Sequence, residues 1–444
     1  DFMQGSDTNQ RSEELRAASR DDAPVRWIAG GYFFDETAFW TTLASRANPA
    51  LTNVTVPGAS IPADGFTSFI PFTVTRQMDK VYSGYGQLEF EPVEKLRLTA
   101  GLRFTSEKKS GVVQDGIVTQ TMPTDPTAFV GDGTINQLLV GATQVPAGSA
   151  LRLACPAPLP FTECFANTPY DLESNLVGGK ISIDYRFDAH TLAYASVSRG
   201  FKAGGVSIGA LDYTARGGSE VLPEHLLTYE VGLKGQWFDN RVRANSAIFL
   251  NDWRNQQLFL PLNTPGTGLN PVYTNVPRTQ SYGFEEELEW APTVDWYLKT
   301  SLGLLHSEVK EVGSALAQSD GALVGSELIA SPKVTWSGLV RKEWAAPGGT
   351  VSLEGNWSYT GAQHFDLVNS PDQIEPGYWL FNSRAAYQFG ATRQYDLSVW
   401  GKNLTGTQYC IERESQAGIP FGNTAVCVPN EARRFFGLTF NARF

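Results

Sequence analysis

Strict alternation of apolar and polar residues over about ten positions recurs along this chain and constrains its fold more than any other feature. Clear examples are residues 95–104, 180–187 and 350–359. Side chains of a β-strand point alternately to its two faces, so each segment predicts a strand with one apolar and one polar face. Strands of soluble proteins average about five or six residues, whereas a tilted membrane-crossing strand needs about nine to 11. The length of these segments therefore favours strands that cross a membrane.

The connections between the segments alternate between very short and very long. The short ones are rich in Asp, Asn, Pro or Gly, the residues of tight turns. They are 21–24, 92–94, 188–190, 239–240, 292–295, 346–349 and 390–393. The long ones are 35–79, 107–174, 202–224, 254–278, 310–333, 361–376 and 404–432. Short turns at the periplasmic end and long loops outside are typical of outer-membrane barrels.

Aromatic residues flank the short turns, as expected of amphipathic rings at the level of the lipid headgroups. They are Phe90, Phe187, Trp237, Phe238, Trp290, Trp296, Trp344, Phe389 and Tyr395.

The alternation fails in two places, because Glu286 falls on an otherwise apolar face and residues 191–201 alternate poorly. A β-bulge would restore the phase in either segment.

Composition and motifs exclude several other classes of protein. No stretch approaches the roughly 20 apolar residues of a membrane-spanning helix. A formal net charge of −11 without a Lys/Arg run argues against nucleic acid as a partner. Serine-hydrolase, zinc-protease and phosphate-loop motifs are missing, so we expect neither an enzyme nor a bound metal or cofactor. His364 and Asp366 are better explained as polar loop residues than as an acid–base pair.

The four cysteines form two close pairs, Cys155/Cys164 and Cys410/Cys427. Each pair lies in a loop-like stretch rich in Pro, Gly and Asn. All the histidines are far from these cysteines in sequence, which disfavours a metal site. We therefore expect two loop disulfides formed in the oxidising periplasm.

Counting the segments predicts about fifteen strands, beginning near residues 11–19 and ending at 433–444. An odd number of strands with both ends unpaired leaves two open edges, which a bilayer does not tolerate. We therefore expect residues 1–444 to form the C-terminal part of a larger, all-β, antiparallel transmembrane barrel in the outer membrane of a Gram-negative bacterium.

Several segments, spread over nearly the whole chain, resemble the barrel of TonB-dependent receptors. They are SRGFKAGG at 198–205, YEVGLK at 229–234, GFE at 283–285, GKNL at 401–404 followed by Tyr409, and the closing segment 433–444. The resemblance implies a barrel of about 22 strands around an N-terminal plug. This sequence shows no plug, no energy-coupling box and no early strands. Its terminal Phe444, on an alternating strand, looks like the signal by which the barrel-assembly machinery recognises outer-membrane proteins.

The resemblance also implies active uptake of a scarce nutrient such as a ferric siderophore, powered by the TonB energy-coupling complex through the plug. Extracellular loops and the upper lumen would then bind the small-molecule substrate. The candidate residues are Trp253, Arg254, Gln256, Tyr273, Arg278, Arg199 and Lys202. Arginine and aromatic side chains suit ferric chelates or glycans. Arg199 and Lys202 could equally meet anionic lipopolysaccharide. The alternatives are a passive porin, an uptake receptor for an oligosaccharide or another non-iron substrate, and a soluble adhesin or lectin.

Overall fold

A single antiparallel sheet dominates the computed structural model, which describes residues 2–44, 67–121, 151–153, 165–206, 220–264, 268–313, 324–415, 425–429 and 433–443. Fifteen strands follow one another in chain order in this sheet. They are β1 (Phe2–Ala18), β2 (Val25–Ala44), β3 (Thr67–Val93), β4 (Leu96–Thr121), β6 (Phe165–Arg186), β7 (Thr191–Lys202), β10 (Glu224–Trp237), β11 (Val242–Thr264), β12 (Gly268–Trp290), β13 (Trp296–Glu311), β14 (Val334–Ala346), β15 (Gly349–Thr360), β18 (Tyr378–Phe389), β19 (Tyr395–Lys402) and β22 (Phe435–Ala442).

Smaller elements lie in the long connections. The strand β5 (Leu151–Leu153) pairs with β4, and three two-stranded sheets join β8 (Gly205–Val206) to β9 (Glu220–Val221), β16 (Gln363–His364) to β17 (Ile374–Glu375), and β20 (Cys410–Ser415) to β21 (Ala425–Pro429). A 3-10 helix, η3, spans Pro371–Gln373. Nothing helical in the described ranges has the length and apolar character to cross a membrane.

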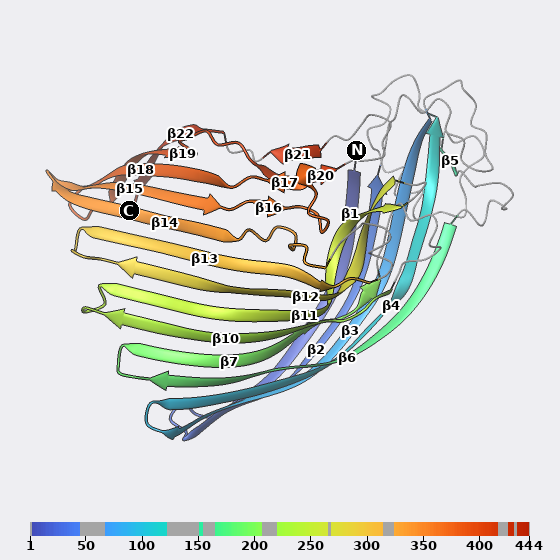
Figure 1. Ribbon diagram of the computed structural model, residues 1–444, viewed down its shortest axis with the longest axis horizontal. Coiled ribbons are helices and arrows are strands. Elements are labelled where there is room, and N and C mark those ends of the chain that lie inside the picture. Colours follow the sequence, from blue (N-terminus) through green and yellow to red (C-terminus); the bar gives the residue numbers. More distant parts are fainter. Residues whose placement is uncertain are drawn as a thin grey trace.

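The sheet curves strongly from its first strands to its last, as Figure 1 shows. Among the described residues β1 pairs only with β2, and β22 only with β19. The predicted short turns are confirmed, since each lies between two consecutive paired strands. The predicted number of strands is confirmed as well. The first strand begins at Phe2, earlier than expected, because the polar residues before position 11 still pair with β2.

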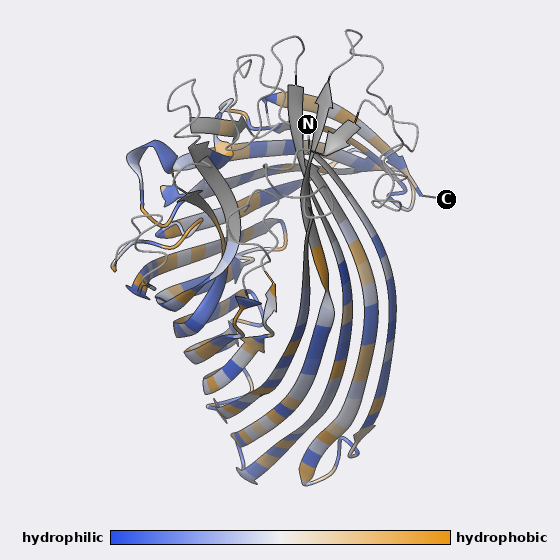
Figure 2. Ribbon diagram, turned by 90° about the vertical axis from the view of Figure 1, so that its right-hand side faces the viewer, coloured by the Kyte–Doolittle hydropathy of each residue, from blue (hydrophilic) through white to orange (hydrophobic). Residues whose placement is uncertain are grey.

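One face of the sheet exposes large apolar side chains. On β4 these include Leu98 and Leu102, and Leu102 is 63% exposed. The register carries the same face to Ile181 and Ile183 of β6. Figure 2 shows the resulting alternation of orange and blue along the strands. A large contiguous apolar surface of this kind is what lipid chains cover. We call it the lipid face, and the opposite, polar side the lumen face.

A cluster of aromatic rings closes the lipid face at the outer ends of β14, β15 and β18. Trp336 contacts Trp357 and Trp379, with ring centroids 5.7 and 5.6 Å apart. Trp379 also contacts Tyr359 and Phe381. All of these residues stand on the lipid face, eight to 11 residues from the periplasmic turns. The aromatic residues at the turns therefore have a counterpart at the opposite end of the strands, an arrangement typical of outer-membrane barrels.

The expected long loop 254–278 is largely strand, and strands also enter the expected loops 35–79 and 107–174 from both ends, so the prediction was wrong for these residues. β11 and β12 remain paired as far as Thr264 and Gly268, across most of the expected loop 254–278. β2 and β3, and likewise β4 and β6, extend far into the stretches 35–79 and 107–174. Beyond the membrane both faces of a strand meet water or other loops, so the apolar alternation stops while the backbone pairing continues.

The two segments that broke the alternation contain no bulge. The registers of residues 279–290 with β13 and of 191–202 with β10 run without a shift. Glu286 therefore stands on the lipid face, where its carboxylate accepts a hydrogen bond from the hydroxyl of Ser246 on β11. This bond offsets part of the cost of placing a carboxylate against lipid. In β7 the alternation is weak because the lipid face bears small residues, such as Ala193, while Tyr194 stands on the lumen face.

The buried apolar core lies above the membrane part of the sheet rather than within it. Leu260, Val276 and Val309, from β11, β12 and β13, pack with Leu328 and Leu367 from the connections that follow β13 and β15. The amide of Leu328 donates to the hydroxyl of Ser307, on the lumen face of β13, over 3.2 Å. These two connections thus fold inward over the upper lumen and are held there by apolar burial.

The segment YEVGLK is explained by one ring on the neighbouring strand. Tyr194 of β7 lies opposite Gly232, where a Cβ atom would come within 2.5 Å of the ring. The Tyr194 hydroxyl donates to Glu230 over 2.7 Å, and the ammonium of Lys234 lies 5.3 Å from the ring centroid. Three alternate residues of the segment therefore surround one aromatic side chain on the lumen face. Only glycine leaves room for the ring to lie flat on the strand.

Candidate functional site

The upper lumen face carries a row of small polar side chains across neighbouring strands. Thr228, Asn251, Ser281 and Ser307 are successive register partners on β10, β11, β12 and β13. Thr228 contacts Asn251 over 2.8 Å, and the Asn251 amide donates to Ser281 over 3.4 Å. Hydroxyls and amides can both donate and accept hydrogen bonds, so this row can contact a polar ligand. Sequence reasoning missed most of it, because only the register aligns residues from four strands.

Above this row the ribbon of β11 and β12 changes which residues face the lumen. Asn255 has a φ of 52°, and the register between β12 and β13 shifts at Arg278/Thr279. By alternation Gln256 would share the face of Arg254. Instead, its side-chain oxygen accepts a hydrogen bond from the hydroxyl of Thr279, on the lumen face, over 2.6 Å. Asparagine tolerates the left-handed backbone that makes this change possible. Trp253, two residues before Asn255, is on the lumen face by alternation.

Lys202 and Tyr273 belong to a cluster that fastens two extracellular connections together. The Lys202 ammonium donates to the Tyr273 hydroxyl and lies 5.1 Å from the centroid of its ring. The Tyr273 hydroxyl donates to Gln257, whose side-chain amide donates to the carbonyl groups of Ala203 and Leu222 over 2.8 and 3.0 Å. These contacts hold the outer ends of β7 and β10 against the ribbon of β11 and β12.

Arg254 and Arg278 stand on the other side of the wall. They share the lipid face of β11 and β12 with Asp252, just beyond the apolar band. Arg278 makes two hydrogen bonds to Asp252, of 2.9 and 3.0 Å, and Glu311 lies 3.5 Å from Arg254 and 3.8 Å from Arg278. Arg199 is also exposed on the lipid face, on β7. The seven candidate residues therefore do not form one group. Trp253 and Gln256 stand on the lumen face, Arg199, Arg254 and Arg278 stand on the lipid face, and Lys202 and Tyr273 belong to the cluster that fastens the connections.

An acidic cluster on the lumen face of β3 and β4 holds the connection that follows β7. Lys109 forms an ion pair with Glu107 and donates to the carbonyl group of Gly204 over 3.0 Å. Asp79 lies 4.0 Å from the same ammonium, and one of its carboxylate oxygens is buried without a hydrogen-bond partner. Asp79 lies 14 residues from the periplasmic end of β3, and its neighbour Lys80 interrupts the apolar side chains of the lipid face beyond Tyr82, so this cluster is outside the membrane.

Burial, with the nearby Glu107 carboxylate, raises the pKa of Asp79 to about 6. Because this folded-state pKa exceeds the ordinary value of 3.8, the favourable contribution of neutral Asp79 is present below about pH 4 and is lost as the pH rises through about 6. We expect amide hydrogen exchange in β8 to become faster between about pH 4 and 7, beyond its intrinsic pH dependence. Asp79→Asn should abolish this extra dependence, and an unchanged pH profile in that variant would contradict the assignment.

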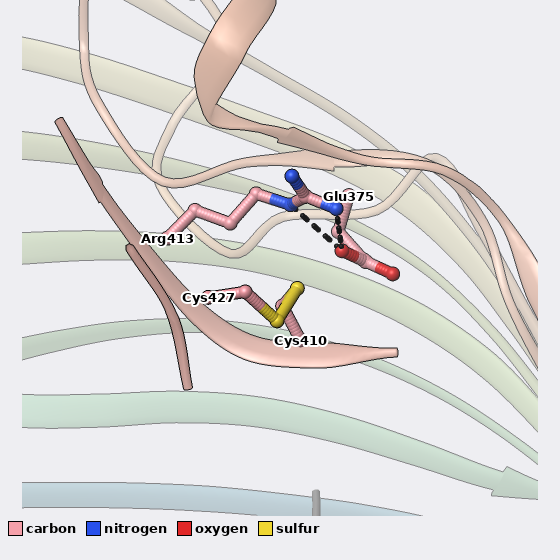
Figure 3. Close-up of a disulfide and its surroundings, with 4 residues drawn as sticks. All are labelled: Glu375, Cys410, Arg413 and Cys427. Carbon is pink, nitrogen blue, oxygen red and sulfur yellow. Dashed lines mark hydrogen bonds and ion pairs between the residues drawn. A yellow bond between two sulfur atoms is a disulfide. The ribbon is translucent and has the colours of Figure 1, made fainter. Parts of the chain in front are cut away.

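A disulfide-bonded hairpin, formed by β20 and β21, lies between β19 and β22 in the chain. Cys410 and Cys427 are joined, with their Cα atoms 5.3 Å apart, and Cys410 is buried. Arg413 of the same hairpin donates through Nε and Nη2 to one carboxylate oxygen of the buried Glu375, over 2.8 Å in each case, as Figure 3 shows. This ion pair links the connection after β19 to the connection after β15. The other expected bond, between Cys155 and Cys164, and the terminal Phe444 lie outside the described residues.

His364 and Asp366 have structural partners. The carboxylate of Asp366 accepts a hydrogen bond from the backbone amide of Ser370 over 3.0 Å, and His364 lies 3.9 Å from Glu327. They support the fold of the connection after β15, as expected for loop residues. Across the described ranges, no group of three or more His, Cys, Asp or Glu side chains is arranged to hold a metal ion.

A curved antiparallel sheet with a lipid face, a polar lumen face and two aromatic interfaces defines the wall of an outer-membrane β-barrel. The family described as "TonB dependent receptor-like, beta-barrel" matches residues 3–404, and the chain belongs to this family. The family consists of receptors in the outer membrane and not of enzymes.

Individual relatives are more distant. The chain is 24% identical over 246 residues to the ferric-pyoverdine M114 receptor PbuA of Pseudomonas sp. (strain M114), which is 55% of this chain and 26% of that protein. The ferric yersiniabactin uptake receptor FyuA of Yersinia pestis is similar in structure, with a TM-score of 0.69 and 17% identity over 100% of this chain and 55% of that one. The copper transporter OprC has a TM-score of 0.60 at 17% identity, covering 100% and 57%. The chain thus spans about half the length of these structures.

Proposed function

We propose that this chain is part of a receptor that takes up a scarce nutrient across the outer membrane, powered by the TonB complex. The family match over residues 3–404 carries this proposal. A wall with a hydrated inner face suits a transport route, because polar solutes need water or hydrogen-bonding groups along their path. The small polar row of the upper lumen face supplies such groups without a fixed charge.

We propose a ferric siderophore as the substrate class. The relatives PbuA and FyuA are named as receptors for ferric pyoverdine and ferric yersiniabactin, which supports this choice. Trp253 offers an aromatic surface, and Lys202 with Tyr273 offers a cationic and hydroxyl group at the same outer end. Ferric chelates carry aromatic and anionic groups that such side chains bind by stacking and charge-assisted hydrogen bonds.

Ligand binding to the complete, purified receptor tests the site. Trp253→Ala should weaken the binding of the ferric siderophore that the cells use, by roughly tenfold, because a large aromatic contact is lost. Arg254→Ala is the matched control. Arg254 is the next residue in the chain but stands on the lipid face, so its loss should change the affinity by no more than about twofold. Equal losses in both variants would contradict the division between the faces.

Uptake by cells tests the energy source. Iron transport should stop in a strain without TonB although the receptor still binds its ligand. Uptake that continues without TonB would indicate a passive porin. Binding of an oligosaccharide or a copper complex, in place of all ferric chelates, would overturn the substrate class and leave the receptor assignment intact.

A further inference from the structure

The ribbon of β11 and β12 turns different sets of residues inward below and above Asn255. Below it, Trp253 stands on the lumen face by alternation. Above it, Leu260 is fully buried in the apolar cluster over the upper lumen, and Phe259 beside it is 63% exposed. Trp253 and Leu260 are an odd number of residues apart, so an unbroken strand would place them on opposite faces. The change of phase between them brings both side chains to the inner side.

The backbone at Asn255 makes this change of phase. Its φ of 52° lies in the left-handed region, which asparagine and glycine adopt most readily. By the register on either side, Pro277 of β12 lies opposite Asn255, and proline has no amide hydrogen to donate to a partner strand. The interruption of the ladder therefore involves both strands. Because it depends on the backbone conformation, glycine should replace asparagine here without strain.

The inward position of Leu260 provides an anchor for two connections. Leu328, in the connection after β13, and Leu367, in the connection after β15, belong to the same apolar cluster as Leu260. We call the described residues 324–333 and 361–377 of these connections the roof. If the ribbon continued without the change of phase, Leu260 would point away from the lumen and the roof would lose this contact.

The roof also forms hydrogen bonds beside Trp253. Trp253, Thr279 and Val309 are successive register partners on β11, β12 and β13. The amide of Val309 donates to the carbonyl group of Ser326, in the roof, over 2.8 Å. The row of side chains that contains Trp253 therefore ends at the roof.

We propose that Asn255 is a positioning residue for the binding of the ferric siderophore. Its left-handed backbone places Trp253 and Leu260 on the same side, so the roof is anchored beside the aromatic surface that would contact the ligand. A roof that is already in place before the ligand arrives reduces the conformational entropy lost on binding. This inference rests on the proposed function and names a residue that acts through the roof rather than by contact with the ligand.

Amide hydrogen exchange in the complete, purified receptor without ligand tests the anchoring. Alanine is strained in a left-handed backbone and glycine is not. In Asn255→Ala we expect the amide of Leu328, which donates to Ser307, to exchange roughly tenfold faster, because release of the roof relieves the strain. In Asn255→Gly it should exchange within about twofold of the wild type.

Asn240→Ala is the matched control. Asn240 has a similar φ of 63° but lies in the periplasmic turn before β11, so the same substitution introduces the same strain at the opposite end of the strand. It should change the exchange of Leu328 by no more than about twofold. Equally fast exchange in Asn255→Ala and Asn240→Ala would indicate general destabilisation and overturn the inference.

Affinity for the ferric siderophore secreted by the same cells tests the link to binding. Asn255→Ala should bind it roughly tenfold more weakly, because the roof is then in place for a smaller fraction of the time. Asn255→Gly should restore the affinity to within about twofold of the wild type. Faster exchange with unchanged affinity would mean that the roof is not part of the site. Weaker affinity with unchanged exchange, or an equal loss in the glycine variant, would mean that the asparagine side chain itself contacts the ligand.

The two measurements separate this inference from the proposed function. A wild-type receptor that binds no ferric siderophore would overturn the substrate class and, with it, the role of Asn255 in binding. The exchange of Leu328 is measured without ligand, so it decides the anchoring of the roof in either case. Normal siderophore binding and uptake in Asn255→Ala would overturn the positioning role and leave the transport function intact.

Discussion

Leu102→Arg is expected to destabilise the barrel in a lipid bilayer by about 2–4 kcal/mol, the cost of an arginine near the middle of the lipid face. Leu102 is exposed on that face of β4, six residues from the first residue of the strand. At about 3.4 Å per residue and a tilt near 40°, this places it roughly 15 Å into an apolar band about 25 Å tall. An arginine there cannot reach either interface without bending or drawing in water.

Thr99→Arg is the matched control on the same strand. Thr99 stands on the lumen face, where its register partner on β3 is Glu89, so a new arginine meets water and a carboxylate. Its effect should be within about 1 kcal/mol. The measurement is the free energy of unfolding in denaturant after folding into phospholipid vesicles. If the two variants lose the same stability, Leu102 does not face lipid and the assignment of the two faces is wrong.

Glu375→Ala is expected to release the disulfide-bonded hairpin from the connection after β15. The carboxylate is almost fully buried and accepts two hydrogen bonds from Arg413. Its removal leaves a partly buried guanidinium without compensation, which costs about 3 kcal/mol in such sites. Amide hydrogen exchange of β20 in the complete receptor should then be roughly 100-fold faster.

Glu412→Ala is the control for this second experiment. Glu412 neighbours Arg413 on β20 but is exposed, so its loss should change the exchange of β20 little. The Cys410–Cys427 bond remains in both variants and keeps the hairpin itself closed. Fast exchange in both variants, or in neither, would show that the Glu375–Arg413 ion pair does not hold the hairpin in place.

The sequence alone determined the class of fold, the periplasmic turns and the apolar face of most strands. These features depend on residues close together in the chain, because alternation has a period of two and tight turns require particular residue types. The face of the last strand, with Phe436, Leu438 and Phe440 exposed, follows from the same rule.

Only the tertiary structure decided the faces and partners of residues in the outer half of the strands. Arg254 and Trp253 are neighbours in sequence but stand on opposite faces. The positive φ of Asn255 then places Gln256 on the lumen face, against the alternation. The row of Trp253, Thr279 and Val309 likewise depends on the registers between three strands. Registers and left-handed residues are chosen by contacts between distant parts of the chain, which no local period records.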